Sequence, residues 1–141
     1  MPEFNNPADA EIGRYLANAR RVAVVGMSPD RERPSYGVAA ALDRLGFEIT
    51  AVRPDCEDVR GFPAVPELQA LPEPADLAVV FRRPETLGAV VDDAIAGRIP
   101  GLWFQLGVVD TAAALRARAA GLFVVMDRCI YRDGIPLLQA E

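Results

Sequence analysis

Histidine and lysine are both missing from this chain of 141 residues, and each absence narrows the range of functions. Without histidine there is no Ser-His-Asp or Cys-His nucleophile system, no histidine general base and no histidine-ligated metal site. The two cysteines, Cys56 and Cys129, are too few for a four-cysteine zinc site or a disulfide framework. These absences favour a binding protein with reduced thiols over an enzyme, and we predict no catalytic residue and no metal site.

Positive charge and long apolar runs are also scarce. Fifteen basic residues, all arginine, stand against twenty acidic residues, which argues against a nucleic-acid partner. No apolar run approaches the roughly 18 residues that a membrane-spanning helix needs, and no signal peptide is visible. Since 51% of the residues are hydrophobic, we expect a single cytoplasmic domain over residues 1–141 with a proper core and no contact with a membrane.

Short apolar runs alternate with helical patterns, which is typical of βαβ units in a parallel sheet. Strands are expected over residues 21–26, 47–52, 77–81, 102–104 and 122–126. Ser35 is expected to cap a helix that ends at Leu45, and Asp110 a helix over 111–120. Residues 1–20 should contain a helix that packs on the domain, and residues 130–141 a C-terminal tail.

The predicted fold class is therefore α/β, a Rossmann-like three-layer fold with a five-stranded parallel sheet in the order 3-2-1-4-5. A flavodoxin-like order stays open, because five strands alone do not exclude it. Either order places a ligand in the crevice outside the carboxyl ends of the strands.

Arginines gather at those strand ends in an otherwise acidic chain. Six of the fifteen follow expected strands or their first turns: Arg31, Arg33, Arg53, Arg82, Arg83 and Arg128. Such a cluster indicates an anionic ligand with several phosphates. Because acidic residues such as Asp30, Asp55 and Asp127 share the region, a salt-bridged loop surface is the alternative.

Gly26 ends the first expected strand, where a glycine allows a tight turn and lets the backbone approach a phosphate near a helix N-terminus. Ser28 stands where the second glycine of a dinucleotide fingerprint would be, so the loop is not an NAD motif. After the second strand, Arg53 precedes Pro54 where NAD-binding proteins place an acidic residue, and it favours a ribose phosphate, as in NADP or coenzyme A. Pairing of Arg53 with Asp55 or Glu57 is the alternative.

Other strand-end residues are interpreted as structural, as ligand-binding or as either. Trp103 and Phe104 are expected in the core, while Phe81 could flank a purine ring. Gly107 permits close backbone approach, and a simple turn explains it equally well. Cys129 is interpreted as a structural thiol, with a redox-sensitive thiol beside Arg128 as the minority alternative.

Taken together, these motifs resemble the small Rossmann-like CoA-binding protein family, which is related to the CoA-binding domain of succinyl-CoA synthetase α subunits. The resemblance extends from about residue 12 to residue 131, and residues 24–29, 33–36, 80–84, 103–108 and 126–129 carry it. It implies coenzyme A in the strand-end crevice, with phosphates at the Gly26 loop and the far side closed by Gln105 and Gly107. Arg53 stands where the family usually has asparagine, so its phosphate contact is inferred from the residue alone. The complete set of candidate ligand-binding residues is Gly26, Met27, Ser28, Arg33, Ser35, Tyr36, Arg53, Pro54, Phe81, Arg82, Gln105, Gly107, Met126, Asp127 and Arg128.

A non-catalytic protein that binds coenzyme A or an acyl-CoA is the function these features favour. An NADP-dependent oxidoreductase is one alternative, although no substrate domain accompanies Arg53. A nucleotide-sensing interaction domain is another, and a partner protein or a homodimer stays open.

Overall fold

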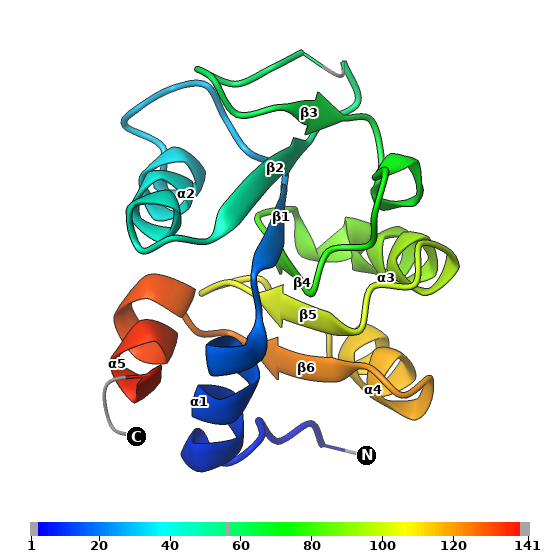
Figure 1. Ribbon diagram of the computed structural model, residues 1–141. Helices are drawn as coiled ribbons and strands as arrows, with labels where there is room; N and C mark the ends of the chain where they lie inside the picture. Colours follow the sequence, from blue (N-terminus) through cyan, green and yellow to red (C-terminus); the bar gives the residue numbers. More distant parts are fainter. Residues whose placement is uncertain (1–2, 56, 139–141) are drawn as a thin grey trace.

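A computed structural model describes residues 3–55 and 57–138 and has a parallel sheet at its centre (Figure 1). The sheet has six strands, in the order β3-β2-β1-β4-β5-β6, and every neighbouring pair is parallel. Their bounds are β1 (Arg21–Val25), β2 (Glu48–Val52), β3 (Ala64–Val65), β4 (Leu77–Val80), β5 (Gly101–Phe104) and β6 (Phe123–Met126). The predicted α/β class with a Rossmann-like parallel sheet is confirmed, since 3-2-1-4-5-6 is the Rossmann order.

The predicted number of strands is wrong, because the structure has six and the sequence indicated five. The additional strand, β3, has two residues and lies between Pro63 and Pro66, so its apolar signal is too short to recognise. It pairs with β2 at the edge where we expected residues 77–81, and Leu77–Val80 instead pairs with β1. Without β3, the five expected strands are in the flavodoxin-like order 2-1-3-4-5 that the sequence left open.

Helices cover both faces of the sheet and make the three layers that the sequence predicts (Figure 1). One face packs against α1 (Asp9–Asn18), α2 (Pro34–Arg44) and α5 (Ile135–Leu138), and the other against α3 (Leu87–Ala96) and α4 (Thr111–Ala119). Alternation along β5 sends fully buried Trp103 into the first face and fully buried Phe104 into the second, as expected for both. Short 3₁₀ turns, η1 (Leu68–Ala70) and η2 (Pro84–Thr86), lead toward β4 and into α3.

Both ends of the described chain pack against the domain. Ile12 and Leu16 of α1 are buried in the core, as expected. In the part of the expected C-terminal tail that the structure describes, residues 130–138, the π-helical turn η3 (Ile130–Gly134) leads into α5, which packs against α1. The two helices approach closely at Gly13, where a Cβ atom would lie 2.9 Å from the Leu137 carbonyl oxygen. Each described helix is too short or too polar to cross a membrane.

Candidate functional site

Gly26 turns the chain out of β1 in the conformation that the sequence predicts. Its φ of +85° is in the left-handed region, and its N–H donates to the carbonyl oxygen of Val52 at a distance of 3.0 Å. A Cβ atom at this position would lie 2.3 Å from the carbonyl oxygen of Phe81, closer than side chains ever approach. Gly26 therefore allows the loop after β1 to pass directly beside the end of β4.

The loop after Gly26 leads to an uncapped helix. The predicted N-cap at Ser35 is wrong: α2 begins at Pro34, Arg33 occupies the cap position, and no side chain caps the helix. Pro34 has the backbone angle that the first helical position needs, so the helix starts two residues earlier than a cap at Ser35 predicts. The hydroxyl of buried Ser35 accepts a hydrogen bond from the Ser28 N–H at 2.9 Å, and so ties the loop to the helix. The positive end of α2 remains available to an anion.

A hollow of about 320 Å³, which we call the Gly26 hollow, lies at this helix N-terminus. It brings together five predicted residues from the ends of β1, β4 and the start of α2, and adds one proline: Gly26, Ser28, Arg33, Ser35, Phe81 and Pro34. Met27 is only 2% exposed and its side chain packs in the core, so only its backbone can serve a ligand here. Tyr36 is half-buried against the same core, with the Arg60 guanidinium 5.9 Å from the centre of its ring.

A second hollow of about 230 Å³, the Pro54 hollow, lies at the carboxyl ends of β1 and β2 and against α3. Pro54 and Arg82 line it, together with Val25, Val52 and acidic Asp93. The Asp93 carboxylate already accepts hydrogen bonds from the backbone N–H groups of Leu68 and Gln69. The two hollows therefore occupy the strand ends around β1, where the strand order reverses and α/β proteins bind ligands.

The strand-end arginines divide into two groups. Arg53 pairs with Asp55 at 3.2 Å, as its alternative interpretation predicts, and Arg128 pairs with Asp9 at 3.4 Å. Within residues 3–55 and 57–138, no ion pair or hydrogen bond involves the guanidinium groups of Arg31, Arg33, Arg82 and Arg83. Four positive charges thus stay available at the carboxyl edge of an acidic protein.

The candidate residues after β5 and β6 hold two loops together and lie outside both hollows. Buried Gln105 accepts a hydrogen bond from the Ile130 N–H at 2.8 Å, and Asp127 accepts one from the Gly107 N–H at 2.8 Å. Gly107 has a φ of +81° and no atom near its Cβ position, so the simple turn explains it. Met126 is buried, and its backbone N–H and carbonyl both bond to the side chain of Asn6.

The structure describes Cys129, one of the two cysteines. Half-buried Cys129 packs beside the core, and its N–H donates to the Asp133 carboxylate at 3.0 Å, which fits a structural thiol. Cys56 lies outside the described residues. In the described part of the chain, no group of three or more His, Cys, Asp and Glu side chains could hold a metal ion.

Sequence reasoning missed three residues near this edge. Pro34 could have been found from the preference of proline for the first helical turn. The other two are far in sequence from the residues that they contact. The Nε of Arg60 donates to the Pro29 carbonyl oxygen at 2.6 Å, and the side chain of Asn6 bonds to Met126. Local sequence patterns carry no signal for such contacts.

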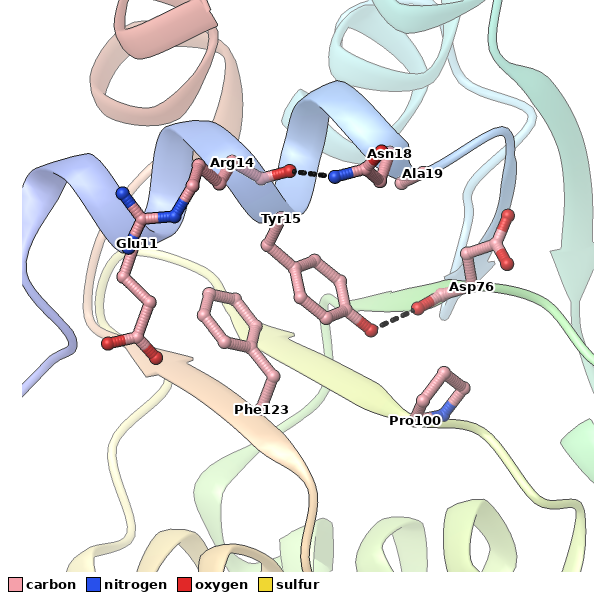
Figure 2. Close-up of a pocket in the computed structure, with 8 residues that line it drawn as sticks. All are labelled: Glu11, Arg14, Tyr15, Asn18, Ala19, Asp76, Pro100 and Phe123. Atoms are coloured by element: carbon pink, nitrogen blue, oxygen red, sulfur yellow. Dashed lines mark hydrogen bonds between the residues drawn. The ribbon is translucent and has the colours of Figure 1, made fainter.

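A hollow of about 500 Å³ lies at the opposite edge, near the amino ends of the strands (Figure 2). Tyr15 stacks on Phe123 with ring centres 4.1 Å apart, and its hydroxyl donates to the Asp76 carbonyl oxygen at 2.6 Å. Burial raises the pKa of Tyr15 to about 12, and the charge of Asp76 adds to the effect. The Asp76 carboxylate accepts from two backbone N–H groups, so this polar cluster fastens α1 to the sheet.

Comparison with known proteins decides the family. Residues 20–134 match the CoA binding domain family. The chain belongs to this family. A CoA binding domain implies a CoA-related ligand, in agreement with the expectation from the strand-end motifs.

Relatives of this CoA binding domain protein span nearly the whole chain. It is 37% identical over 127 residues to protein YneT of Bacillus subtilis (strain 168), covering 90% of this chain and 94% of that one. A solved structure from Thermus thermophilus is 32% identical with a TM-score of 0.87, covering 93% of this chain and 99% of that chain. Another, from Pyrococcus horikoshii OT3, is 29% identical with a TM-score of 0.89, covering 98% of this chain and 99% of the other.

Proposed function

We propose that this protein binds coenzyme A or an acyl-CoA at the carboxyl ends of its parallel strands and performs no chemistry on it. The observation that carries the proposal is the Gly26 hollow, where an uncapped helix N-terminus, a close-packed glycine turn and the unpaired Arg33 guanidinium meet. Backbone N–H groups and the positive end of a helix dipole are suited to phosphate. The diphosphate of coenzyme A is the ligand group that this hollow would take.

The charges around the Gly26 hollow suggest where the remaining groups of the ligand would lie. The 3′-phosphate ribose and adenine would lie toward β2, where Arg53 follows the strand and where Pro54 and Arg82 line the Pro54 hollow. Because Arg53 has only 19% of its side chain exposed and already pairs with Asp55, the ribose phosphate would join this pair rather than meet an isolated cation. Phe81 borders the Gly26 hollow and offers an apolar surface to the ligand.

A binding role without catalysis rests on the chemistry of the side chains. The chain contains no histidine that could act as a general base or be phosphorylated. The side chains at the Gly26 hollow are serines, an arginine, a proline and an aromatic ring, which bind and orient an anion. We therefore propose a carrier, sensor or regulatory role for the protein, in the cytoplasm.

Isothermal titration of the protein with coenzyme A, dephospho-CoA and NADP tests the proposal. Arg33 and Arg44 form a matched pair, since both are exposed and lie at opposite ends of α2. A charge-assisted hydrogen bond contributes about 1.5–3 kcal/mol, so we expect Arg33→Ala to weaken binding of coenzyme A by about tenfold or more. Arg44→Ala should leave the affinity unchanged.

Three results would contradict the proposal. Wild-type protein that gives no binding isotherm with coenzyme A would remove it entirely. Equal losses of affinity in Arg33→Ala and Arg44→Ala would move the ligand away from the Gly26 hollow. Tighter binding of NADP than of coenzyme A, with turnover of the nicotinamide, would favour the oxidoreductase alternative.

A further inference from the structure

A two-residue hairpin between β2 and β3 holds an arginine in a conformation that turn chemistry disfavours. Val59 and Phe62 exchange two backbone hydrogen bonds of 2.9 Å, so Arg60 and Gly61 form the turn. Both have a positive φ, +46° for Arg60 and +93° for Gly61, as in a type I′ turn. Asparagine, aspartate or glycine is the usual first residue of such a turn. An arginine kept there points to a role for its side chain outside the turn.

The guanidinium of Arg60 reaches the loop between β1 and α2. Its Nε donates to the carbonyl oxygen of Pro29 at 2.6 Å, and its Cζ lies 5.9 Å from the centre of the Tyr36 ring, within reach of a cation–π contact. Pro29 directly follows Ser28. Tyr36 directly follows Ser35, whose hydroxyl accepts the Ser28 N–H at 2.9 Å. One side chain therefore contacts both sides of the loop, one residue beyond the bond that joins them.

The loop over residues 28–33 has few other ties to the rest of the molecule. The Ser28 hydroxyl and the Asp30 carboxylate each accept from the backbone N–H two residues on, so these bonds stay within the loop. Among the hydrogen bonds and ion pairs of the described residues, the bond from Arg60 is the one that fixes the loop beyond Ser28 to a segment distant in sequence. Because Ser28 and Arg33, at the two ends of the loop, line the Gly26 hollow, any movement of the loop changes the hollow.

The hairpin is a firm base for this contact. Val59 is fully buried in the core that α2 also joins, and Phe62 packs against the same core. The Asp58 carboxylate accepts the N–H of Ala64 at 3.2 Å, which fastens the hairpin to the start of β3. Arg60 therefore connects the loop to a part of the fold that is itself held in place.

We propose that Arg60 is a positioning residue for the ligand, which holds the loop over residues 28–33, and with it the Gly26 hollow, in the form that binds a diphosphate. This inference rests on the proposed function. The apparent affinity for a ligand falls in proportion to the fraction of the protein that has the binding form. A charge-assisted hydrogen bond together with a cation–π contact is enough to change that fraction by up to about tenfold. Loss of the guanidinium should therefore weaken binding of coenzyme A by about three- to tenfold.

The variants Arg60→Asn and Arg98→Asn test this role by isothermal titration with coenzyme A. Arg60→Asn removes the guanidinium and keeps the turn, because Asn-Gly is the favoured pair in a type I′ hairpin. Arg98 is the matched control, since it is also exposed and left-handed, with a φ of +59°, but lies between α3 and β5 at the amino end of a strand. Arg60→Asn should bind coenzyme A about three- to tenfold more weakly than wild type, and Arg98→Asn should bind it as wild type does. Urea unfolding should show that both variants remain folded.

Amide hydrogen exchange in the ligand-free proteins separates positioning from a direct contact with the ligand. The N–H groups of Ser28, Glu32 and Arg33 bond to the loop or to α2, and their exchange reports how often the loop opens. They should exchange about three- to tenfold faster in Arg60→Asn than in wild type and at the wild-type rate in Arg98→Asn. Weaker binding without faster exchange would mean that the guanidinium meets a phosphate directly, which would overturn the positioning role.

The outcomes also separate this inference from the proposed function. If coenzyme A does not bind wild type at all, the proposed function fails and the positioning role fails with it. If coenzyme A binds wild type and Arg60→Asn equally well, the proposed function stands and the positioning role alone is overturned. Equal losses of affinity in Arg60→Asn and Arg98→Asn would likewise overturn it.

Discussion

Replacing Gly26 by alanine places a methyl group where the loop after β1 passes the end of β4. Two separate costs arise there. A residue with a side chain pays about 1–2 kcal/mol for the left-handed conformation, which Gly26 adopts with a φ of +85°. The new Cβ atom would also lie 2.3 Å from the Phe81 carbonyl oxygen, so the backbone must move, at a further cost of about 1–3 kcal/mol. We expect Gly26→Ala to lose about 2–5 kcal/mol of stability.

Gly121→Ala is the matched control for this substitution. Gly121 has a similar φ of +94°, but nothing lies within 4 Å of its Cβ position, so only the conformational cost applies. Urea unfolding can be followed through the fluorescence of Trp103, the only tryptophan in the chain and fully buried. Gly26→Ala should unfold at clearly lower urea than Gly121→Ala and should bind coenzyme A more weakly. Equal destabilisation of the two variants, with affinity for coenzyme A retained in both, would refute the reasoning.

Three further results are expected. Wild type should bind dephospho-CoA about tenfold more weakly than coenzyme A, and Arg53→Ala should remove that difference. Equal affinities of wild type for the two ligands would exclude a contact between Arg53 and the ribose phosphate. Because the pKa of Tyr15 rises from 10.0 to about 12 on folding, the folded state keeps a proton that the unfolded state loses, so the free energy of unfolding should fall between pH 10 and pH 12. Tyr15→Phe should lack this decrease when its free energy of unfolding is measured with urea across that pH range. The same pH dependence in Tyr15→Phe and in wild type would argue against a raised pKa of Tyr15. Asn6→Ala removes two hydrogen bonds to Met126, of 2.8 and 3.0 Å, and should cost about 1–3 kcal/mol, whereas Asn5→Ala, whose carbonyl oxygen alone bonds to the fold, should cost little.

The parts of the fold that could be predicted from sequence are those whose signal is local. The apolar runs that became β1, β2, β4, β5 and β6 are visible because strands covered on both faces are apolar throughout. Asp110 caps α4 through its bond to Ala113, as its position before the helix predicts. The strand β3 was missed because two residues between prolines carry no periodicity.

The candidate site could be predicted in part for the same reason. Gly26 was found because a glycine at the end of a strand is a local signal for a tight turn. Gln105, Met126 and Asp127 also lie at the carboxyl ends of strands, yet their polar groups bond to partners in other segments. Tertiary contacts decide which polar groups are already hydrogen-bonded within the protein. A position at the end of a strand does not reveal whether a side chain is still available to a ligand.

The side chain of Asn6 has a consequence for assembly. It bonds to both the N–H and the carbonyl of Met126 on the outermost strand, and so takes the hydrogen bonds that a neighbouring strand would need there. At the other border of the sheet, β3 offers two residues flanked by prolines, which is a poor template for strand addition. Edge-to-edge pairing of the sheets of two copies is therefore disfavoured at both borders.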